Sequence, residues 1–263
     1  MQDFFSSHDN QQPHRSVESI VAEGYSFNAT RSIQHGFSRF GKEAGIYVAF
    51  TLVYIALILV ANAIPFVGDI ANLLVSAPLI AGFICYGLRQ RKDEFREFST
   101  FFGGFSKANW ASLVSQGILV NLCMLLAVAV VVLPFFWDPV SIFFGAAEQL
   151  SSMSQERAGE YLISLFNPSI IQASGLSVIV VVLVTTLFSL APFFIVYRGY
   201  NAMEAMRASY LVVKAKYLSF LGLNFLLWLL LITGFLMCCV GILIALPVYY
   251  LSFAAVYEEI TGD

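Results

Sequence analysis

The sequence predicts an all-α membrane bundle, with six transmembrane helices and three short helices in the cytoplasmic membrane interface. Two observations lead to this fold class. Of the 263 residues, 59% are hydrophobic and only 12% are charged, whereas about 25% is usual for charged residues in a soluble domain. The hydrophobic residues also gather in uninterrupted runs that are long enough to cross a bilayer. A soluble fold of this size could not bury so much apolar surface.

Six segments approach or meet the length of about 20 residues that an α-helix needs to cross a hydrocarbon core of about 30 Å. The predicted spans are 44–63, 70–88, 111–133, 175–197, 218–237 and 240–257. Only a few residues separate the first two spans and the last two, so each of these pairs is expected to form a tight hairpin. One long helix is the alternative for the last pair, but it would be about twice the required length.

Lysine and arginine residues predict the orientation, because they accumulate on the cytoplasmic side of membrane proteins. Thirteen of the fourteen precede the odd-numbered spans, and only Arg157 lies in the segment 134–174. This bias places both termini in the cytoplasm and makes 134–174 one long outward loop. The membrane domain is then 28–257, between a disordered cytoplasmic tail at 1–27 and a short one at 258–263. The expected location is a cell membrane, the inner membrane in a bacterium.

The segment before each odd-numbered span is amphipathic. Its aromatic or apolar residues recur at intervals of three and four, which places them on one face of a helix. The three sets are Ile33, Phe37 and Phe40; Phe95, Phe98, Phe102 and Phe105; and Met203, Met206, Tyr210, Val213 and Tyr217. Helices with such a face and with basic residues on the other lie in the membrane interface. Membrane lipids are therefore an expected partner.

Each even-numbered span contains a proline, and no odd-numbered span does. These prolines are Pro78, Pro192 and Pro247. Proline bends a helix because it lacks a backbone N–H and clashes with the preceding turn. In lipid, the carbonyl that loses its partner must find another one. We interpret the chain as three repeats of an interfacial helix, a straight span and a kinked span. The middle repeat contains the outward insertion. The alternative is a coincidence, since proline is common in membrane helices.

Part of the sequence resembles a known family. The residues that carry the resemblance are Ala-Met-Arg-Ala-Ser-Tyr at 205–210, the segment 214–217, Gly241 and Pro247. They are similar to bacterial multi-pass membrane proteins of unknown function, which resemble the membrane domain of some glycerophosphoryl diester phosphodiesterases. The resemblance covers mainly the C-terminal third of the chain. In that family a separate soluble domain performs catalysis, so the resemblance implies a fold and a compartment, and no activity.

The sequence offers no catalytic residue, no cofactor site and no metal site. It lacks the common nucleophile, phosphate-binding, dinucleotide-binding and metalloprotease motifs, and its cysteines lack the spacing of a zinc site. A net charge of −3 argues against binding to nucleic acid. Carboxylates cluster only in the outward segment, as Glu148, Glu156 and Glu160. Their serine-rich surroundings favour a solvated helix over acid–base chemistry.

The spans contain no ionisable residue near their centres, which argues against a proton-coupled transporter. Five neutral polar residues in the spans either line a cavity or hydrogen-bond across helix contacts. They are Ser115, Gln116, Thr185, Ser189 and Asn224. We predict a protein that is not an enzyme and that has a structural or regulatory role in contact with lipid and a protein partner. A transporter or permease-like protein for a lipidic or apolar solute is the alternative.

Overall fold

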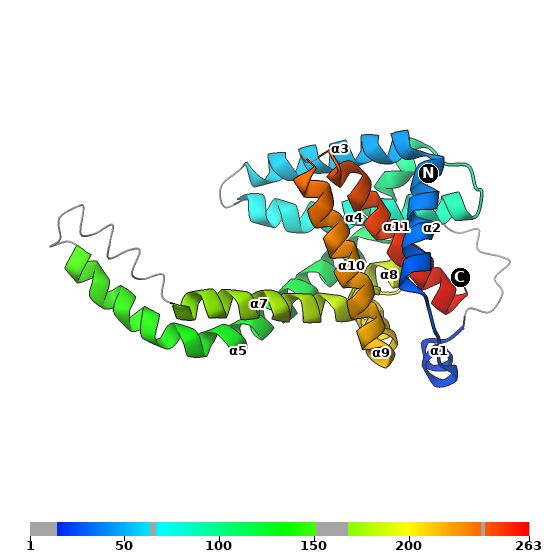
Figure 1. The fold of residues 1–263 in the computed structure, drawn as a ribbon. Coiled ribbons are helices and arrows are strands. Elements are labelled where there is room, and N and C mark those ends of the chain that lie inside the picture. The colour runs from blue at the N-terminus through cyan, green and yellow to red at the C-terminus, as the bar shows by residue number, and fades with distance from the viewer. Residues whose placement is uncertain (1–14, 64–66, 151–167, 238–239, 263) are drawn as a thin grey trace. The chain divides into compact units, whose positions relative to one another are not determined.

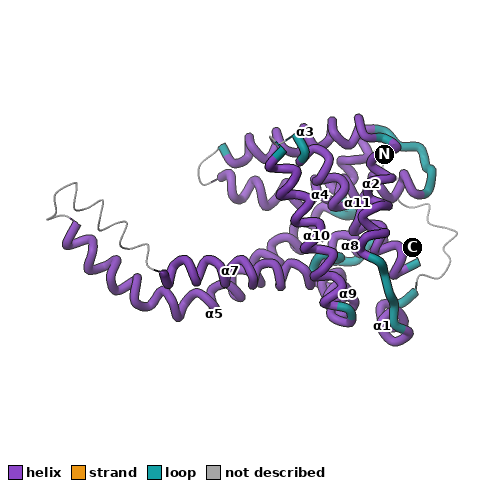
Figure 2. Tube along the Cα trace, viewed as in Figure 1, coloured by secondary structure: helices purple, strands orange, loops and turns teal. Residues whose placement is uncertain are grey.

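The computed structural model describes residues 15–63, 67–150, 168–237 and 240–262. All regular elements in these residues are helices (Figures 1 and 2), which confirms the predicted all-α class. Five helical segments are long and apolar enough to cross a membrane. They are Ala44–Asn62, Trp110–Leu133, Gln172–Arg198, Tyr217–Leu236 and Ile242–Thr261.

The chain divides into two bodies. The main body comprises residues 1–118 and 186–263, and the second body comprises residues 119–185. The second body contains most of two helices, α5 (Trp110–Leu150) and α7 (Pro168–Leu187). The contacts described below all lie within the main body unless the second body is named.

The segment predicted as a disordered tail contains a short helix, α1 (Val17–Glu23). The side chain of Ser16 caps its first turn by accepting a hydrogen bond from a backbone N–H. Val17 and Ile20 are buried, and α1 packs against α9 (Ala202–Ala215). A cap and two apolar residues on one face therefore order this part of the tail, although its composition is polar.

The first and third repeats share one helical layout. The first consists of α2 (Ala29–Lys42), α3 (Ala44–Asn62) and α4 (Val67–Arg91). The third consists of α9, α10 (Tyr217–Leu236) and α11 (Ile242–Thr261). Both short helices, α2 and α9, have 14 residues. The 25-residue α4 contains the predicted span 70–88, but it is not among the five apolar segments.

These two repeats also correspond residue by residue, 173 positions apart. Asn28 and Asn201 are the caps of α2 and α9, and each side chain accepts a hydrogen bond from the third backbone N–H of its helix. Glu43 and Lys216 join the short helix to the next one with nearly the same backbone angles, φ −142° and ψ 42° against φ −134° and ψ 41°. The corresponding buried pairs are Ser32 and Ala205, Gly36 and Ser209, Phe40 and Val213, Tyr47 and Phe220, Phe50 and Leu223, and Thr51 and Asn224. This agreement favours true repetition over coincidence.

The second repeat departs from this layout at its short element. The predicted interfacial α-helix is instead η1 (Phe98–Phe105), a 3-10 helix. Gly103 and Gly104 lie within it, and glycine disfavours the α-helix. A Cβ atom at Gly104 would lie 2.1 Å from the carbonyl oxygen of Pro78 in α4. The short element of this repeat is therefore shaped by its close approach to α4.

The described parts of the expected outward loop 134–174, which are 134–150 and 168–174, are helical. The 41-residue α5 continues to Leu150, and α7 begins at Pro168. A helix can continue through a proline when it gives up one backbone hydrogen bond, so Pro134 did not mark the end of α5. Glu156, Glu160 and Arg157 lie outside the described residues.

The predicted hairpins are present. Between the first two spans, a Cβ atom at Gly68 in α4 would lie 2.4 Å from the carbonyl oxygen of Ala61 in α3, so the two helices touch near the turn. At the other end of the chain, α10 ends at Leu236 and α11 begins at Ile242, which excludes one long helix. Here Gly234 packs on Gly241, and a Cβ atom on Gly234 would lie 2.9 Å from the Gly241 carbonyl oxygen.

The helix break at Pro192 shows how a proline is accommodated. Residues 188–190 form a turn between α7 and α8 (Ala191–Arg198). The Ser209 hydroxyl of α9 donates to the carbonyl oxygen of Leu187 at 2.8 Å and accepts from the backbone N–H of Leu190 at 3.2 Å. One serine from the third repeat thus satisfies both backbone groups at the break, as the rule for backbone in lipid requires.

The other two prolines also face the short element of another repeat. Gly104 in η1 lies on the carbonyl of Pro78, as described above. Gly36 in α2 lies on α11 next to Pro247, where a Cβ atom would be 3.0 Å from the Val248 carbonyl oxygen. Each short element therefore packs on the kinked helix of the preceding repeat, and the first packs on the last. The three repeats close into a ring.

Aromatic rings fill the space between α3, α4 and η1. Phe101 of η1 is fully buried, and its ring stacks on Phe50 and on Tyr86 with centroids 4.2 Å apart in each case. Phe83 stacks on Tyr250 of α11 at 5.5 Å, which continues the cluster to the last helix. Such ring pairs contribute about 0.5–1.5 kcal/mol each beyond their area burial. They hold the short 3-10 helix firmly against the bundle.

The close contact between α2 and α11 gives a test of the ring. We expect Gly36→Leu to destabilise the protein by about 1–3 kcal/mol, because overpacking a tight contact costs that much. A Cβ atom at Gly36 would be 2.3 Å from the Ser252 hydroxyl and 3.1 Å from its backbone nitrogen. Thermal unfolding of the full chain in detergent measures the change.

Gly41→Leu is the matched control. Gly41 lies on the same helix, and a Cβ atom there meets nothing within 4 Å. Its replacement should leave stability unchanged or raise it slightly, because leucine favours a helix over glycine. Equal melting temperatures for the two variants would contradict the packing described for Gly36.

Candidate functional site

A buried carboxylate lies at the end of α11. Glu258 is 7% exposed, and Arg39 of α2 binds it through both guanidinium nitrogens, Nη1 at 3.1 Å from Oε1 and Nη2 on Oε2. The hydroxyl of Tyr197 in α8 donates to the same Oε1 at 2.6 Å. Arg91 of α4 places its Nε 3.5 Å from Oε2. One carboxylate therefore joins the ends of four helices, and two arginines share it.

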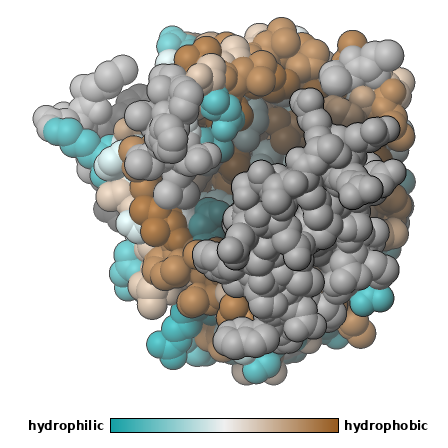
Figure 3. Space-filling model, turned by 90° about the vertical axis from the view of Figure 1, so that its left-hand side faces the viewer, coloured by the Kyte–Doolittle hydropathy of each residue, from teal (hydrophilic) through white to brown (hydrophobic). Residues whose placement is uncertain are grey.

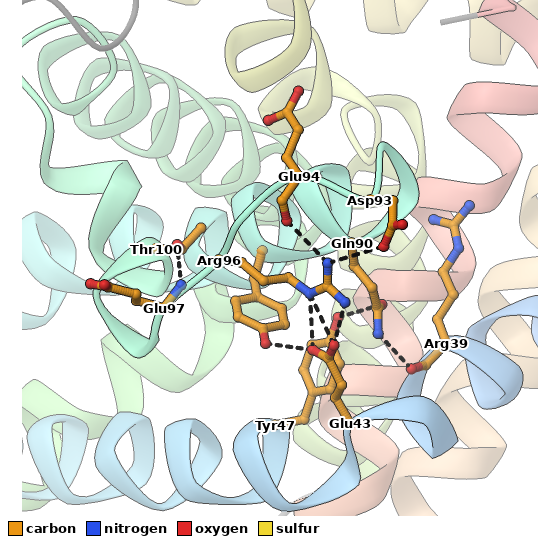
Figure 4. A network of polar contacts seen from close by, with 10 residues as sticks. Arg39, Glu43, Tyr47, Gln90, Asp93, Glu94, Arg96, Glu97 and Thr100 are labelled. Atoms are coloured by element: carbon orange, nitrogen blue, oxygen red, sulfur yellow. Dashed lines mark hydrogen bonds and ion pairs between the residues drawn. The ribbon is translucent and has the colours of Figure 1, made fainter.

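A second ion pair lies where α3 begins. Arg96, which follows α4, places its Nε 2.9 Å from Oε1 of Glu43 and also binds it through Nη2 (Figure 4). The hydroxyl of Tyr86 in α4 donates to the other oxygen, Oε2, at 2.5 Å. The hydrogen bonds from Arg96 hold the pKa of the Glu43 carboxyl below its ordinary value. The carboxylate therefore stays ionised and paired at neutral pH.

Two neutral side chains link α3 and α4 to α2. The hydroxyl of Tyr47 donates to Oε1 of Gln90 at 3.0 Å, and Nε2 of Gln90 donates to the backbone carbonyl of Arg39 at 3.1 Å (Figure 4). We call the residues Arg39, Glu43, Tyr47, Tyr86, Gln90, Arg91, Arg96, Tyr197 and Glu258 the polar network. It ties α2, α3, α4, α8 and α11 together at one end of the main body.

The chemistry open to the polar network is limited by its pairing. Both carboxylates accept hydrogen bonds from an arginine and a tyrosine, so neither is placed to exchange a proton with a substrate. Buried ion pairs with additional hydrogen bonds are suited to fixing one arrangement of helices. Among the described residues, no group of three or more His, Cys, Asp and Glu side chains is placed to hold a metal ion. The network therefore serves to fix the arrangement of the helices, and we call this role a structural lock.

Sequence reasoning did not find the centre of this network. Glu258 was assigned to a short cytoplasmic tail, 258–263, whereas α11 continues to Thr261 and buries it. The available signal was the apolar pattern of α11, which extends to Ile260. Arg39 was counted only for its charge, because a pairing across 219 residues leaves no local trace in the sequence.

The five polar residues predicted within the spans do not all have the same environment. Ser115 is exposed, and Gln116 is buried. Thr185, in the second body, donates to the carbonyl oxygen of Val181 in its own helix at 2.7 Å. Ser189 has a buried hydroxyl oxygen with no hydrogen-bond partner in the described structure. None of the five is among the residues that line the groove between the beginning of α2 and α10.

Asn224, the fifth, belongs to a small polar cluster between helices. Its Nδ2 donates to the hydroxyl of Thr186 at 2.8 Å, and the hydroxyl of Tyr249 donates to its Oδ1 at 3.3 Å. Asn224 is 1% exposed. Its groups are thus paired across helix contacts, so Asn224 has the hydrogen-bonding role and does not line a cavity.

Three phenylalanines of η1 and Phe95, which precedes it, form the set that the sequence pattern grouped together. Phe95 is 80% exposed, and Phe98, Phe102 and Phe105 are between 36% and 38% exposed. The ring centroids of Phe98 and Phe102 are 6.1 Å apart. Phe101 is the buried exception between them. We call these four residues the phenylalanine patch; Lys92 and Lys107 flank it in the sequence and are exposed.

The other predicted stripes are divided between core and surface. In α2, Phe40 is buried and Phe37 is 42% exposed. In α9, Met206 is buried, whereas Met203 is 66% exposed. Each of these helices packs one face against a kinked helix, so the residues on that face are buried. The predicted stripes therefore do not lie wholly on the surface.

The comparisons with known proteins add nothing to this geometry. No protein family model, curated protein or solved structure matches the chain. What the protein does is therefore argued from its surface, its charges and its internal contacts.

The role of Glu258 as a structural lock can be tested by substitution. We expect Glu258→Gln to destabilise the protein by about 3 kcal/mol, because it leaves two arginines without their buried partner. Thermal unfolding in detergent measures the loss. The neighbouring Glu259 is exposed, and Glu259→Gln should change stability by less than about 0.5 kcal/mol. Similar losses for both variants would mean that only the overall charge matters.

Proposed function

We propose that this chain is an integral membrane protein without catalytic activity, with a structural or regulatory role exerted through lipid and a protein partner. The observation that supports it best is the distribution of polar and apolar groups. The polar network and Asn224 are paired inside the main body, while long helices expose large apolar side chains. Figure 3 shows hydrophobic residues over much of the coloured surface of one face.

The exposed apolar side chains are too large and too numerous for a soluble surface. Leu59 of α3 is 65% exposed, Leu125 of α5 is 65% exposed, and Leu236 of α10 is 75% exposed. Only 6% of the apolar stretch in α5 is buried inside the structure. Contiguous exposed patches of this kind mark contact with a membrane or with another protein. Lipid is the surrounding that suits all of these helices.

The polar network supports the proposed threading of the chain. It gathers the beginning of α3 and the ends of α4, α8 and α11. These ends lie on one side of the bilayer if the chain crosses it six times, with α4 as the remaining span. We place this side in the cytoplasm of a cell membrane, the inner membrane in a bacterium, because nearly all lysines and arginines fall there.

Lipid contact is proposed for the phenylalanine patch as well. Aromatic rings with nearby lysines are suited to the membrane interface, and basic residues near an anionic leaflet contribute about 1 kcal/mol each. The resemblance to the membrane domain of glycerophosphoryl diester phosphodiesterases remains part of this proposal. It agrees with a membrane role that needs no active site in this chain.

A transporter for a lipidic or apolar solute is the second candidate. The break between α7 and α8 favours it, because interrupted helices are common in transporters. The pairing of Leu187, Leu190 and Ser209 weighs against it, since the freed backbone groups are already satisfied within the protein. We therefore prefer the structural role.

Measurements of dye leakage and of lipid movement across vesicle membranes distinguish the structural role from transport. We expect the purified chain, reconstituted into liposomes, to leave the leakage of a trapped dye and the transbilayer movement of a fluorescent phospholipid at the rates of protein-free vesicles. The reason is that Asn224 and the backbone groups at the break before α8 are already paired within the protein. Fluorescence after addition of a membrane-impermeant quencher reports both rates. Faster movement of either probe would overturn the proposed role in favour of transport.

Thiol labelling tests the threading. In a chain whose native cysteines are replaced by alanine, Phe95→Cys should react with a membrane-impermeant maleimide in inside-out vesicles and not in right-side-out vesicles. Phe95 is 80% exposed. Arg157→Cys, in the outward segment, should give the opposite result. Labelling of both cysteines from the same side would contradict the proposed topology.

A further inference from the structure

The main body has an open groove between α2 and α10. The two helices are in contact, and both are labelled in Figure 1. The groove runs from the beginning of α2 along the first turns of α10. Its volume is about 550 Å³. The lining residues are Phe27, Asn28, Ala29, Thr30, Ser219, Gly222, Leu223, Phe225 and Leu226.

The two ends of the groove differ in chemistry. Asn28, Thr30 and Ser219 are polar and lie where α2 and α10 begin, whereas Leu223, Phe225 and Leu226 are apolar. From Ser219 to Leu226 an α-helix rises by about 10 Å. The groove therefore leads from the interface end of α10 towards its hydrocarbon-facing part.

Contacts within the protein hold the Phe27 side of the groove in place. The Phe27 ring packs on Phe220 of α10 with centroids 4.8 Å apart. Two residues earlier, the hydroxyl of Tyr25 donates to the backbone carbonyl of Val212 in α9 at 2.5 Å. These contacts hold the segment between α1 and α2, so the groove needs no rearrangement to open.

Two basic residues lie close in the sequence to the polar lining residues. Arg31 follows Thr30, and Lys216 precedes Ser219 by three residues, which is nearly one helical turn. Both side chains are exposed, and none of the lining residues is acidic. Basic pockets between membrane helices near the cytoplasmic side bind anionic lipid headgroups.

We propose that this groove binds one phospholipid with an anionic headgroup, drawn from the surrounding bilayer. The headgroup lies near Thr30 and Ser219 beside Arg31 and Lys216, and an acyl chain lies on Phe225 and Leu226. This inference rests on the proposed membrane role, in particular on α10 crossing the bilayer. It goes further, because it assigns a single bound lipid to a defined site.

The surroundings favour lipid over a second copy of the chain. The apolar end of the groove continues into an exposed stretch of α10, where Phe225 is 61% exposed and Trp228 is 44% exposed. In a bilayer, this stretch is in contact with acyl chains. An apolar hollow on such a surface is filled by a chain from the same surroundings, because water is not available to fill it.

Gly222 provides a way to close the groove without disturbing the fold. It lines the groove, and a Cβ atom there meets nothing within 4 Å. We expect Gly222→Trp to fill the space that an acyl chain would occupy. Gly45→Trp is the matched control, because Gly45 of α3 also has open space around a Cβ atom and does not line the groove.

Mass spectrometry of the intact protein released from detergent micelles measures the binding. The full-length wild type, titrated with dioleoyl phosphatidylglycerol, should retain one lipid molecule. Gly222→Trp should bind it at least about tenfold more weakly, and Gly45→Trp should match the wild type. The double variant Arg31→Gln with Lys216→Gln should lose the preference for phosphatidylglycerol over phosphatidylcholine and keep the acyl-chain contact.

Each contrary result overturns a stated part of the inference. If wild type retains no lipid, or if the two tryptophan variants bind equally, the groove is not a lipid site. If the charge variant keeps its preference for phosphatidylglycerol, Arg31 and Lys216 do not select the headgroup. Melting temperatures of the variants establish that they are folded. The flux and labelling experiments do not involve Gly222, so failure of the membrane role is distinguishable from failure of the groove.

Discussion

The need to pair backbone groups in a medium without water is the constraint on which this structure depends. A proline in a buried or lipid-embedded helix leaves a carbonyl without its partner, and no solvent can replace that partner. At one of the three proline-containing helices, the short element of another repeat supplies the missing partners. Ser209 satisfies two backbone groups at the break before α8, and glycines allow η1 and α2 to approach the other two kinked helices. The ring of repeats follows from these three contacts.

The ring of repeats also explains why Arg39 and Arg96 lie next to buried or half-buried carboxylates. Because α2 lies across α11, its last turn brings Arg39 to the end of α11, where Glu258 is buried. The segment after α4 then brings Arg96 to Glu43 at the beginning of α3. Positively charged residues, from which we infer the orientation of the chain, thus also hold its helix ends together. The remaining exposed basic residues, such as Arg31 and Lys216, are available to anionic headgroups.

Much of the fold could be predicted because hydrophobic length and helical periodicity are local signals. The apolar runs, both hairpins and the repetition are visible in the sequence, and the matching of Asn28 with Asn201 makes the repetition concrete. What was missed depends on distant contacts. The burial of Glu258 requires Arg39, and the 3-10 form of η1 requires the carbonyl of Pro78 beneath Gly104. The helix beyond Pro134 shows that a proline alone does not end a membrane helix.

The pairing of Arg39 with Glu258 spans 219 residues, almost the whole chain. During synthesis, the first repeat enters the membrane long before its partner helix α11 has left the ribosome. Until α11 has been made, α2 lacks the helix on which Gly36 packs and the carboxylate that Arg39 binds. The ring of repeats can therefore close only once α11 joins the bundle. A variant without α11 would leave the ring open at the first repeat.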